Sequence, residues 1–357
     1  MVGRGFPPPD LKEITMTAYI IRRLLILPLV IFGLSVVIFG MLMLLTPVER
    51  AALYVTSVPK NPAAIQEIIN KYGLNQPIYE QYGRWANNLL HGNLGWSKTA
   101  QMPVINAIET YFPATLELAL WSFVPIIAGG TWLGIQAAIH HDTIIDQAAR
   151  VFSIIGYSFP TFVFGLLVLM IFYANLQWFP PGRLSQWANA VVISSSWHTY
   201  TGMYTVDSLL NGRPDIFLDA LRHLFLPALT LAYVNWALVL RVARSSMLEV
   251  LQQDYIRTAR AKGLPEHDVI FEHARPNAMI PIVTISGLLL VGLLNGVVIT
   301  ETVFNYHGMG LFAANAALNF DAVSVLGIAL LAGSLLVIAN LIVDILYRIM
   351  DPRIQFE

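Results

Sequence analysis

Six long stretches without a charged residue constrain this 357-residue chain more than any other feature. A helix needs about 20 apolar residues to cross the hydrocarbon core of a membrane. Backbone groups in lipid must pair within their own segment, so such stretches are expected to be helical. The sequence therefore predicts an all-α integral membrane protein with six transmembrane helices. The stretches are Leu24–Leu45, Leu118–Ile139, Val151–Phe179, Leu224–Leu240, Ala278–Thr300 and Ala322–Val343.

Composition agrees with this and excludes several classes of protein. Only 12% of the residues are charged, about half the share of a soluble domain, and 56% are hydrophobic. A net charge of −1 argues against a nucleic-acid partner. The chain has no Cys, which excludes disulfides, thiolate metal sites, iron–sulfur clusters and cysteine nucleophiles.

The distribution of basic residues predicts the orientation in the membrane. Segments 1–23, 140–150, 241–275 and 348–357 hold 13 Lys and Arg residues in 79 positions, whereas 46–112, 180–222 and 305–322 hold 8 in 128. Loops rich in Lys and Arg stay in the cytoplasm. Both termini are therefore expected on the cytoplasmic side, with the Arg22-Arg23 pair as the strongest single indication.

The segments between the stretches carry their own helix signals. In the outer region, Pro62–Tyr72 places Ile65, Ile68 and Ile69 on one helical face. Gly92–Ser97 has the glycine spacing of a turn.

The cytoplasmic segment 241–275 is predicted to form a helix, a glycine turn and a second helix. Ser246–Glu249 fits a capping box, Gly263 suits the position after a helix end, and Pro265 suits the start of a helix that Pro276 would limit. Basic and acidic residues are equal in number between Arg244 and Arg275. This balance favours a structured protein-binding surface over a polybasic lipid-binding segment.

Asp254–Gly263, with the sequence DYIRTARAKG, resembles the signature of permeases in binding-protein-dependent ABC importers. Gly263 takes the glycine position of that signature, and Pro276 falls at its terminal proline. The acidic residue of the usual triplet is absent from Arg257–Ala259, and His273 and Arg275 replace the usual Ile and Leu. These departures are similar to the dipeptide/oligopeptide branch, first-permease type.

Five further segments resemble that branch in the same order, so that the resemblance covers residues 17–357. The turn at Pro47–Arg50 and the loop 180–222 depart from the family pattern. The five segments are Tyr19–Leu24, Phe112–Ala119, His223–Leu231, Glu301–Phe304 with Gly308 and Gly310, and Asn340–Asp344 with Asp351–Arg353.

The resemblance implies an ABC type-1 permease fold and a division of the chain. It consists of a cytoplasmic extension (1–16), a first span (17–46), an extracytoplasmic region (47–112), a permease domain (113–347) and a cytoplasmic tail (348–357). Within the permease domain, spans are expected near 113–139, 151–179, 223–243, 278–304 and 322–347, with a coupling loop at 244–277.

The resemblance also implies the function and the partners. Such a permease imports di- or oligopeptides through the inner membrane. It works with a second homologous permease, two cytoplasmic ATP-binding subunits and an extracytoplasmic substrate-binding protein. No G-x-x-x-x-G-K-[ST] phosphate loop occurs in the chain, so ATP and Mg are expected in the ATPases and no cofactor or enzymatic activity in this chain. The residues expected to couple it to an ATPase are Asp254, Tyr255, Arg257, Thr258, Ala259, Arg260, Ala261, Lys262, Gly263, Leu264, Pro265 and His273.

Other polar residues leave alternatives open. Glu301, with Phe304, Gly308 and Gly310, is a candidate gate or docking contact. Glu117 is interpreted as an interfacial carboxylate rather than a contact for a substrate amine. Asp146–Arg150 and Asp344–Arg348 are expected to be i,i+4 ion pairs, the first also a candidate ATPase contact and the second alternatively a pore-facing carboxylate. His140-His141-Asp142 is expected to bind no metal, because adjacent His side chains point apart on a helix.

Two other classes of function compete with the importer. An ion-coupled secondary transporter would need ionisable residues deep inside the spans, and the six stretches contain none. A membrane enzyme would need His, Asp or Glu clustered at one depth, and no such cluster is evident. Within the family, nickel chelates, glutathione and oligosaccharides remain alternative substrates.

Overall fold

The computed structural model describes residues 16–51 and 61–350 of the chain, with side chains described from residue 25 to residue 342 except at position 27. Almost all regular structure in this part is helical, with one two-stranded hairpin. The elements are α1 (Met16–Leu42), α2 (Pro47–Ala51), α3 (Pro62–Tyr72), α4 (Ile78–Leu90), β1 (Trp96–Ser97), β2 (Met102–Pro103), α5 (Val104–Ile139), α6 (Ile144–Ser158), α7 (Thr161–Val168), the π-helix η1 (Leu169–Asn175), α8 (Gln186–Val192), α9 (Tyr204–Leu210), α10 (Pro214–Leu251), α11 (Asp254–Ala261), α12 (Glu266–Asp268), the π-helix η2 (Val269–Ala274), α13 (Arg275–Leu294), α14 (Val298–Val303), α15 (Met309–Leu318) and α16 (Ala322–Met350).

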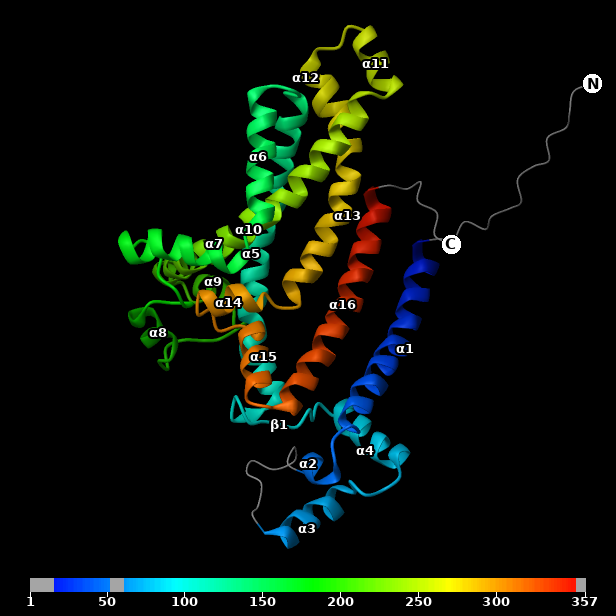
Figure 1. Ribbon diagram of the computed structural model, residues 1–357, viewed down its shortest axis with the longest axis vertical. Coiled ribbons are helices and arrows are strands. Elements are labelled where there is room, and N and C mark those ends of the chain that lie inside the picture. Colours follow the sequence, from blue (N-terminus) through cyan, green and yellow to red (C-terminus); the bar gives the residue numbers. More distant parts are fainter. Residues whose placement is uncertain (1–15, 52–60, 351–357) are drawn as a thin grey trace, which may run out of the picture.

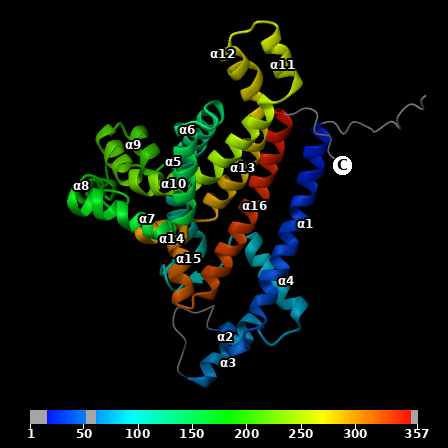
Figure 2. The same cartoon turned by 45° about the horizontal axis from the view of Figure 1, so that its top comes forward.

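Long apolar helices form the body of the molecule. Among the described residues, four helical segments are long and apolar enough to cross a membrane: Val104–Ile139, Pro214–Leu251, Glu266–Leu294 and Ala322–Ile342. α10 packs along α5, and α13 packs against α16, α10 and α5. The 27-residue α1 packs along α16 at the edge of the bundle (Figures 1 and 2).

The stretch predicted to form one span over 151–179 is broken, which corrects the expectation of a single helix there. α6 ends at Ser158, and the helix through α7 and η1 leaves at an angle of 103° to it. Phe159 is extended and Pro160 precedes α7. The residue before a proline avoids the helical region, which allows the chain to turn here. α7 consequently runs across the direction of α6 (Figure 1).

The outer-region helix α3 has the predicted bounds, and its ends show why. The Asn61 side chain accepts a hydrogen bond from the Ala63 N–H, and Gly73 closes the helix with φ +64°. Ile69 is buried with Ile65 and Ile68 packed beside it, as the periodicity predicted.

One carboxylate ties the β1–β2 hairpin to the start of α16. The buried Asp321 accepts hydrogen bonds from the Ser97 hydroxyl and the Thr99 N–H, both at 2.9 Å. It also accepts from the hydroxyl of Ser324 at 2.7 Å and from its N–H at 3.2 Å, as an N-cap residue does. The loop after α4 is thereby fixed to the helix bundle.

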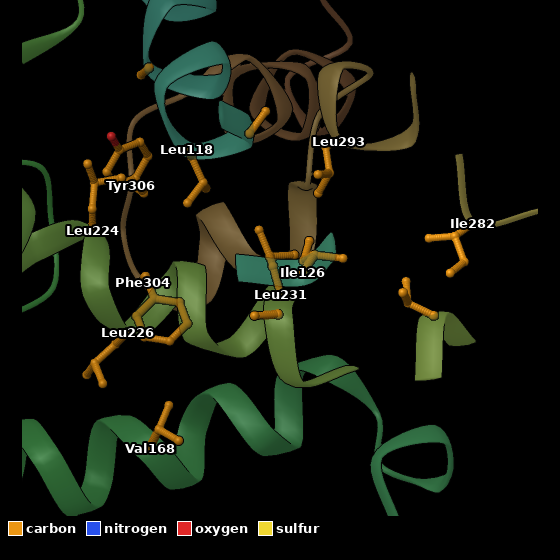
Figure 3. Close-up of a cluster of buried hydrophobic side chains, with 14 of the residues drawn as sticks. Leu118, Ile126, Val168, Leu224, Leu226, Leu231, Ile282, Leu293, Phe304 and Tyr306 are labelled. Atoms are coloured by element: carbon orange, nitrogen blue, oxygen red, sulfur yellow. The ribbon is translucent and has the colours of Figure 1, made fainter. Parts of the chain in front are cut away.

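The main core lies where α5, α7, α10 and α13 meet the segment that follows α14 (Figure 3). Leu118, Leu226, Phe304 and Tyr306 are almost completely buried in it. α5 and α10 approach closely beside this core. A Cβ atom on Gly134 would lie 2.5 Å from the Cβ of Ala243, so this contact requires glycine.

Two details of the predicted cytoplasmic segment are wrong. α10 continues through Ser246 to Leu251, so Ser246 does not cap a helix, and its hydroxyl donates to the Ala278 carbonyl at 3.0 Å. Pro276 does not end the second helix either, because α12, η2 and α13 form one segment, Glu266–Leu294. Pro276 lies in the first turn of α13 directly after the π-helix, where its missing N–H interrupts least.

Candidate coupling surface and buried polar cluster

The short helix α11 is anchored to the bundle by a narrow apolar face. Ile256 is fully buried and Ala259 nearly so, and both pack against Met247 and Val269 in a small core at the end of α10. Gln252 and Gln253 form the turn between α10 and α11. The helix therefore lies at one end of the molecule on a fixed base (Figure 2).

The opposite face of α11 exposes charge. Arg257 pairs with Asp254 at 3.2 Å and Arg260 with Glu266 at 2.6 Å, and all four side chains are exposed. The hydrogen bond to Glu266 raises the pKa of Arg260, so its guanidinium stays charged. Exposed pairs of this kind contribute little to stability. These groups are consequently free to form new contacts with another protein.

The turn after α11 matches the sequence prediction. Gly263 has φ +78°, a conformation that favours glycine, and its N–H donates to the Arg260 carbonyl at 2.9 Å. Pro265 immediately precedes α12. Residues 254–265 thus form one continuous surface feature, which we call the coupling surface. His273 lies outside these residues, half-buried in η2, which packs against α11.

A buried carboxylate fixes the start of α6 beside the end of α10. Asp146 is fully buried and accepts from Arg244 Nε at 2.6 Å and Nη2 at 2.9 Å. Arg150 adds the predicted i,i+4 pair at 2.6 Å. The contact with Arg244 was not predicted, because the two residues are 98 positions apart.

The same place contains the one group of described residues that could hold a metal ion. Ligand atoms of His141, Asp142 and Asp146 lie within 4.8 Å of one another. His141 Nδ1 lies 2.9 Å from Asp142, and both Asp146 oxygens accept from arginines. Two guanidinium groups oppose a further cation, so the geometry favours an ion-pair network.

Glu117 is buried, which corrects its interpretation as an interfacial carboxylate. It is 2% exposed and receives hydrogen bonds from Arg183 Nη2 at 2.9 Å and the Tyr306 hydroxyl at 2.9 Å. The N–H and hydroxyl of Thr205 donate to it at 2.6 and 2.8 Å. Arg183 also stacks on the Tyr204 ring, 4.0 Å from its centroid. All the hydrogen-bonding capacity of the carboxylate is used inside the protein.

Glu301 is likewise buried, and its carboxylate accepts hydrogen bonds at the start of α15. It accepts from the Thr115 hydroxyl at 2.7 Å and the Leu311 N–H at 2.7 Å. Gly308 and Gly310 allow this approach, since a Cβ on either would lie 2.7 and 3.1 Å from the Glu301 carboxyl group, respectively. Phe304 is buried in the main core.

Tyr306 links the two glutamates. Its N–H donates to the backbone carbonyl of Glu301 at 2.8 Å, while its hydroxyl donates to the Glu117 carboxylate. We call Thr115, Glu117, Arg183, Thr205, Glu301 and Tyr306 the buried polar cluster. It connects α5, α9, α14 and α15 with the loop before α8.

The four predicted gate residues lie within the buried polar cluster or beside it, while Arg183, Thr205 and Tyr306 were not foreseen. The Asp344–Arg348 pair lies outside the described side chains.

Comparison with known families places the chain in the class that the coupling surface suggested. The chain belongs to the family described as binding-protein-dependent transport system inner membrane component, whose model matches residues 130–356. A model of the N-terminal membrane component of such systems matches residues 16–119. The chain is therefore a multi-pass inner-membrane permease, and the secondary-transporter and membrane-enzyme alternatives are not supported.

Individual relatives are transport permeases of similar length. The chain is 41% identical over 329 residues to the probable D,D-dipeptide transport system permease protein DdpB of Escherichia coli, covering 92% of this chain and 94% of the relative. It is 38% identical to the di/tripeptide transport system permease protein DppB of Pseudomonas aeruginosa, over 96% of this chain and all of the relative. It is 36% identical to the oligopeptide transport system permease protein AppB of Bacillus subtilis, with the same coverage.

Proposed function

We propose that this chain is the first permease of an ATP-driven importer for di- or oligopeptides. It has six spans with both termini in the cytoplasm. A second homologous permease completes the translocation pathway, two cytoplasmic subunits bind ATP and Mg, and an extracytoplasmic protein delivers the substrate. The observation that carries the proposal is the coupling surface. In a chain of this family, it combines a buried apolar base with exposed ion pairs that can exchange partners.

The mechanism assigned to the coupling surface follows from its two faces. The ATPase receives α11 in a groove, in the manner of a helix that docks its side chains into a partner. Arg257, Arg260 and Lys262 contact the ATPase, while Ile256 and Ala259 hold α11 on α10 and η2. Movement of the ATPase then displaces the end of the bundle and shifts the population between outward-open and inward-open states. This chain performs no hydrolysis itself.

Charge reversal on α11 tests the coupling assignment. The full complex carrying Arg257→Glu and Arg260→Glu is expected to insert and assemble, to hydrolyse ATP, and to lose ATP-driven peptide uptake in proteoliposomes. The matched control for the single variant Arg260→Glu is Arg213→Glu, which reverses a charge at the opposite end of α10. The Arg213–Asp215 pair has a similar exposure, 37% and 48% against 42% and 55% for Arg260–Glu266. Coupled uptake that survives in the double variant would contradict the docking role.

Single cysteines test the six-span topology, because the natural chain has no Cys to interfere. Lys262→Cys on the coupling surface is expected to resist a membrane-impermeant maleimide added to intact cells. Asn93→Cys, in the loop after α4, is expected to react. A cysteine at position 10 reports the N-terminus, and one at position 355 reports the C-terminus. Labelling of Lys262→Cys from outside would overturn the orientation.

The substrate class is proposed from the relatives, which are named for dipeptides, D,D-dipeptides, di- and tripeptides and oligopeptides. Uptake of a labelled dialanine is measured in the reconstituted complex with its binding protein. Competition by unlabelled L,L- and D,D-dipeptides, tripeptides, glutathione and a nickel chelate then ranks the candidates. Competition by the chelate alone would move the chain to a different branch of the family.

A further inference from the structure

A cavity of about 490 Å³ lies between the outer region and the helix ends opposite α11. Its walls come from α1, α2, α3, α4, the β1–β2 hairpin with the loop before it, and α16. Figure 1 shows α4 and β1 gathered at this end of α1 and α16. The volume is in the range of ordinary small-molecule sites.

Part of the lining is apolar and belongs to long apolar helices. Phe39 and Leu42 of α1 contribute to it, as do Leu326 and Leu330 of α16. α1 continues away from the cavity with exposed apolar side chains, among them Val37 at 56% exposed. α1 therefore offers further apolar surface beyond the cavity to an apolar chain bound there.

The lining also carries positive charge without a counter-charge. Arg50, Lys71 and Arg84 line it, and its lining includes no Asp or Glu. Within residues 25–51 and 61–342, none of the three forms an ion pair. Arg50 is nine-tenths buried; its Nη1 donates to Gln81, but its Nε has no hydrogen-bond partner. The Trp96 Nε1–H, also in the lining, has none either. Buried donors of this kind normally find a partner.

We propose that this cavity binds one anionic phospholipid, with its phosphate on Arg50, Lys71 and Arg84 and its acyl chains along α1 and α16. A guanidinium group pairs well with the oxygens of a lipid phosphate. A peptide fits less well because its protonated amine would find no carboxylate. Phosphatidylethanolamine carries the same disadvantage, so phosphatidylglycerol is preferred. Free phosphate would leave the apolar wall unused.

The test begins with the full chain purified in a mild detergent, followed by mass spectrometry of extracted lipid. Phosphatidylglycerol is expected at about one molecule per chain and enriched over phosphatidylethanolamine relative to the membrane. Arg50→Gln with Arg84→Gln is expected to lower the retained lipid at least about tenfold, since hydrogen bonds to charged groups are lost. Arg213→Gln removes an exposed cation elsewhere and should change nothing.

Milder variants keep the test decisive if the buried Arg50 is needed for folding. Lys71→Gln alters an exposed side chain, and Trp96→Phe removes only the indole N–H; each is expected to lower retention several-fold. The purified chain is also heated with phosphatidylglycerol nanodiscs, phosphatidylcholine nanodiscs, inorganic phosphate, or dialanine. Stabilisation by phosphatidylglycerol alone supports the proposal. Equal stabilisation by inorganic phosphate or by dialanine, equal retention of both lipids, or retention unchanged in the variants would overturn it. None of these readouts depends on peptide transport.

Discussion

The coupling surface and the buried polar cluster use similar residue types in opposite ways. On α11, arginines and carboxylates pair at the surface, where the Arg257 and Asp254 side chains are 71% and 93% exposed. In the buried polar cluster, Arg183 and Glu117 pair at 2.9 Å with 11% and 2% exposed. Charges at the surface can exchange partners at little cost, whereas buried charges cannot lose a partner without a large penalty. The first region suits changing contacts, and the second fixes helices in one arrangement.

Removing one member of the buried pair is the most severe way to test this contrast. Glu117→Ala leaves Arg183 buried without its carboxylate and should destabilise the fold by about 3–5 kcal/mol. The midpoint of thermal unfolding in detergent, followed by tryptophan fluorescence, measures the loss. Adding Arg183→Met to Glu117→Leu should recover most of it, because no unpaired charge then remains. A stable Glu117→Ala protein would show that the cluster does not hold the helices.

A methyl group at Gly308 tests the same cluster by crowding. The added Cβ would lie 2.6 Å from the Thr115 hydroxyl and 2.7 Å from the Glu301 carboxyl carbon, so Gly308→Ala should cost about 1–3 kcal/mol. Gly292→Ala in α13 is the matched control, since nothing lies within 4 Å of its Cβ position. The same unfolding measurement compares them. Equal midpoints for the two variants would contradict the close packing at α15.

Lowering the pH should weaken the hydrogen bonds of a third buried carboxylate, Asp321, which ties the hairpin to α16. Burial alone would raise its pKa, but hydrogen bonds from Thr99, Ser324 and Ser97 outweigh this, and its pKa lies below the ordinary value. A lowered pKa contributes stability above the unfolded-state value, about 4, and this contribution is lost as the pH falls toward the folded-state value. Unfolding midpoints between pH 6 and pH 3 should fall less steeply for Asp321→Asn than for the natural chain. Parallel curves would exclude this role.

The smallest effect on stability is expected at the coupling surface. Arg260→Ala breaks an ion pair whose partners are 42% and 55% exposed, so the unfolding free energy should change by less than about 1 kcal/mol. ATP-driven uptake by the complex should nevertheless fall. A large loss of stability would mean that α11 depends on its surface charges, and the contrast between the two regions would disappear.

Local patterns in the sequence predicted part of the local structure, although the capping box at Ser246 and the helix limit at Pro276 were wrong. The bounds of α3 and the left-handed turn at Gly263 follow from caps and glycine chemistry within a few residues. The contacts of Glu117 do not, because Arg183 and Tyr306 are 66 and 189 positions away. Such pairs depend on how the helices pack, which apolar stretches do not specify.

Proline shows the same limit within a single helix. Pro160 lies at the break between α6 and α7, yet Pro113, Pro125 and Pro227 lie inside continuous helices. After the break, α7 packs close to the end of α14, where a Cβ atom on Gly165 would lie 3.2 Å from Val303 and 3.3 Å from Phe304. The sequence predicted one span over 151–179, because nothing local to these prolines indicates which of them interrupts a helix.

The continuity of α10 gives the molecule a mechanical property. Its 38 residues form a rod about 57 Å long, whose far end shifts by about 10 Å for a tilt of about 10°. Pro227 is its one interior proline and leaves the His223 carbonyl without its helical donor. Under the proposed coupling, a displacement of the α11 end would be transmitted along α10 toward α9, and bending would concentrate near Pro227.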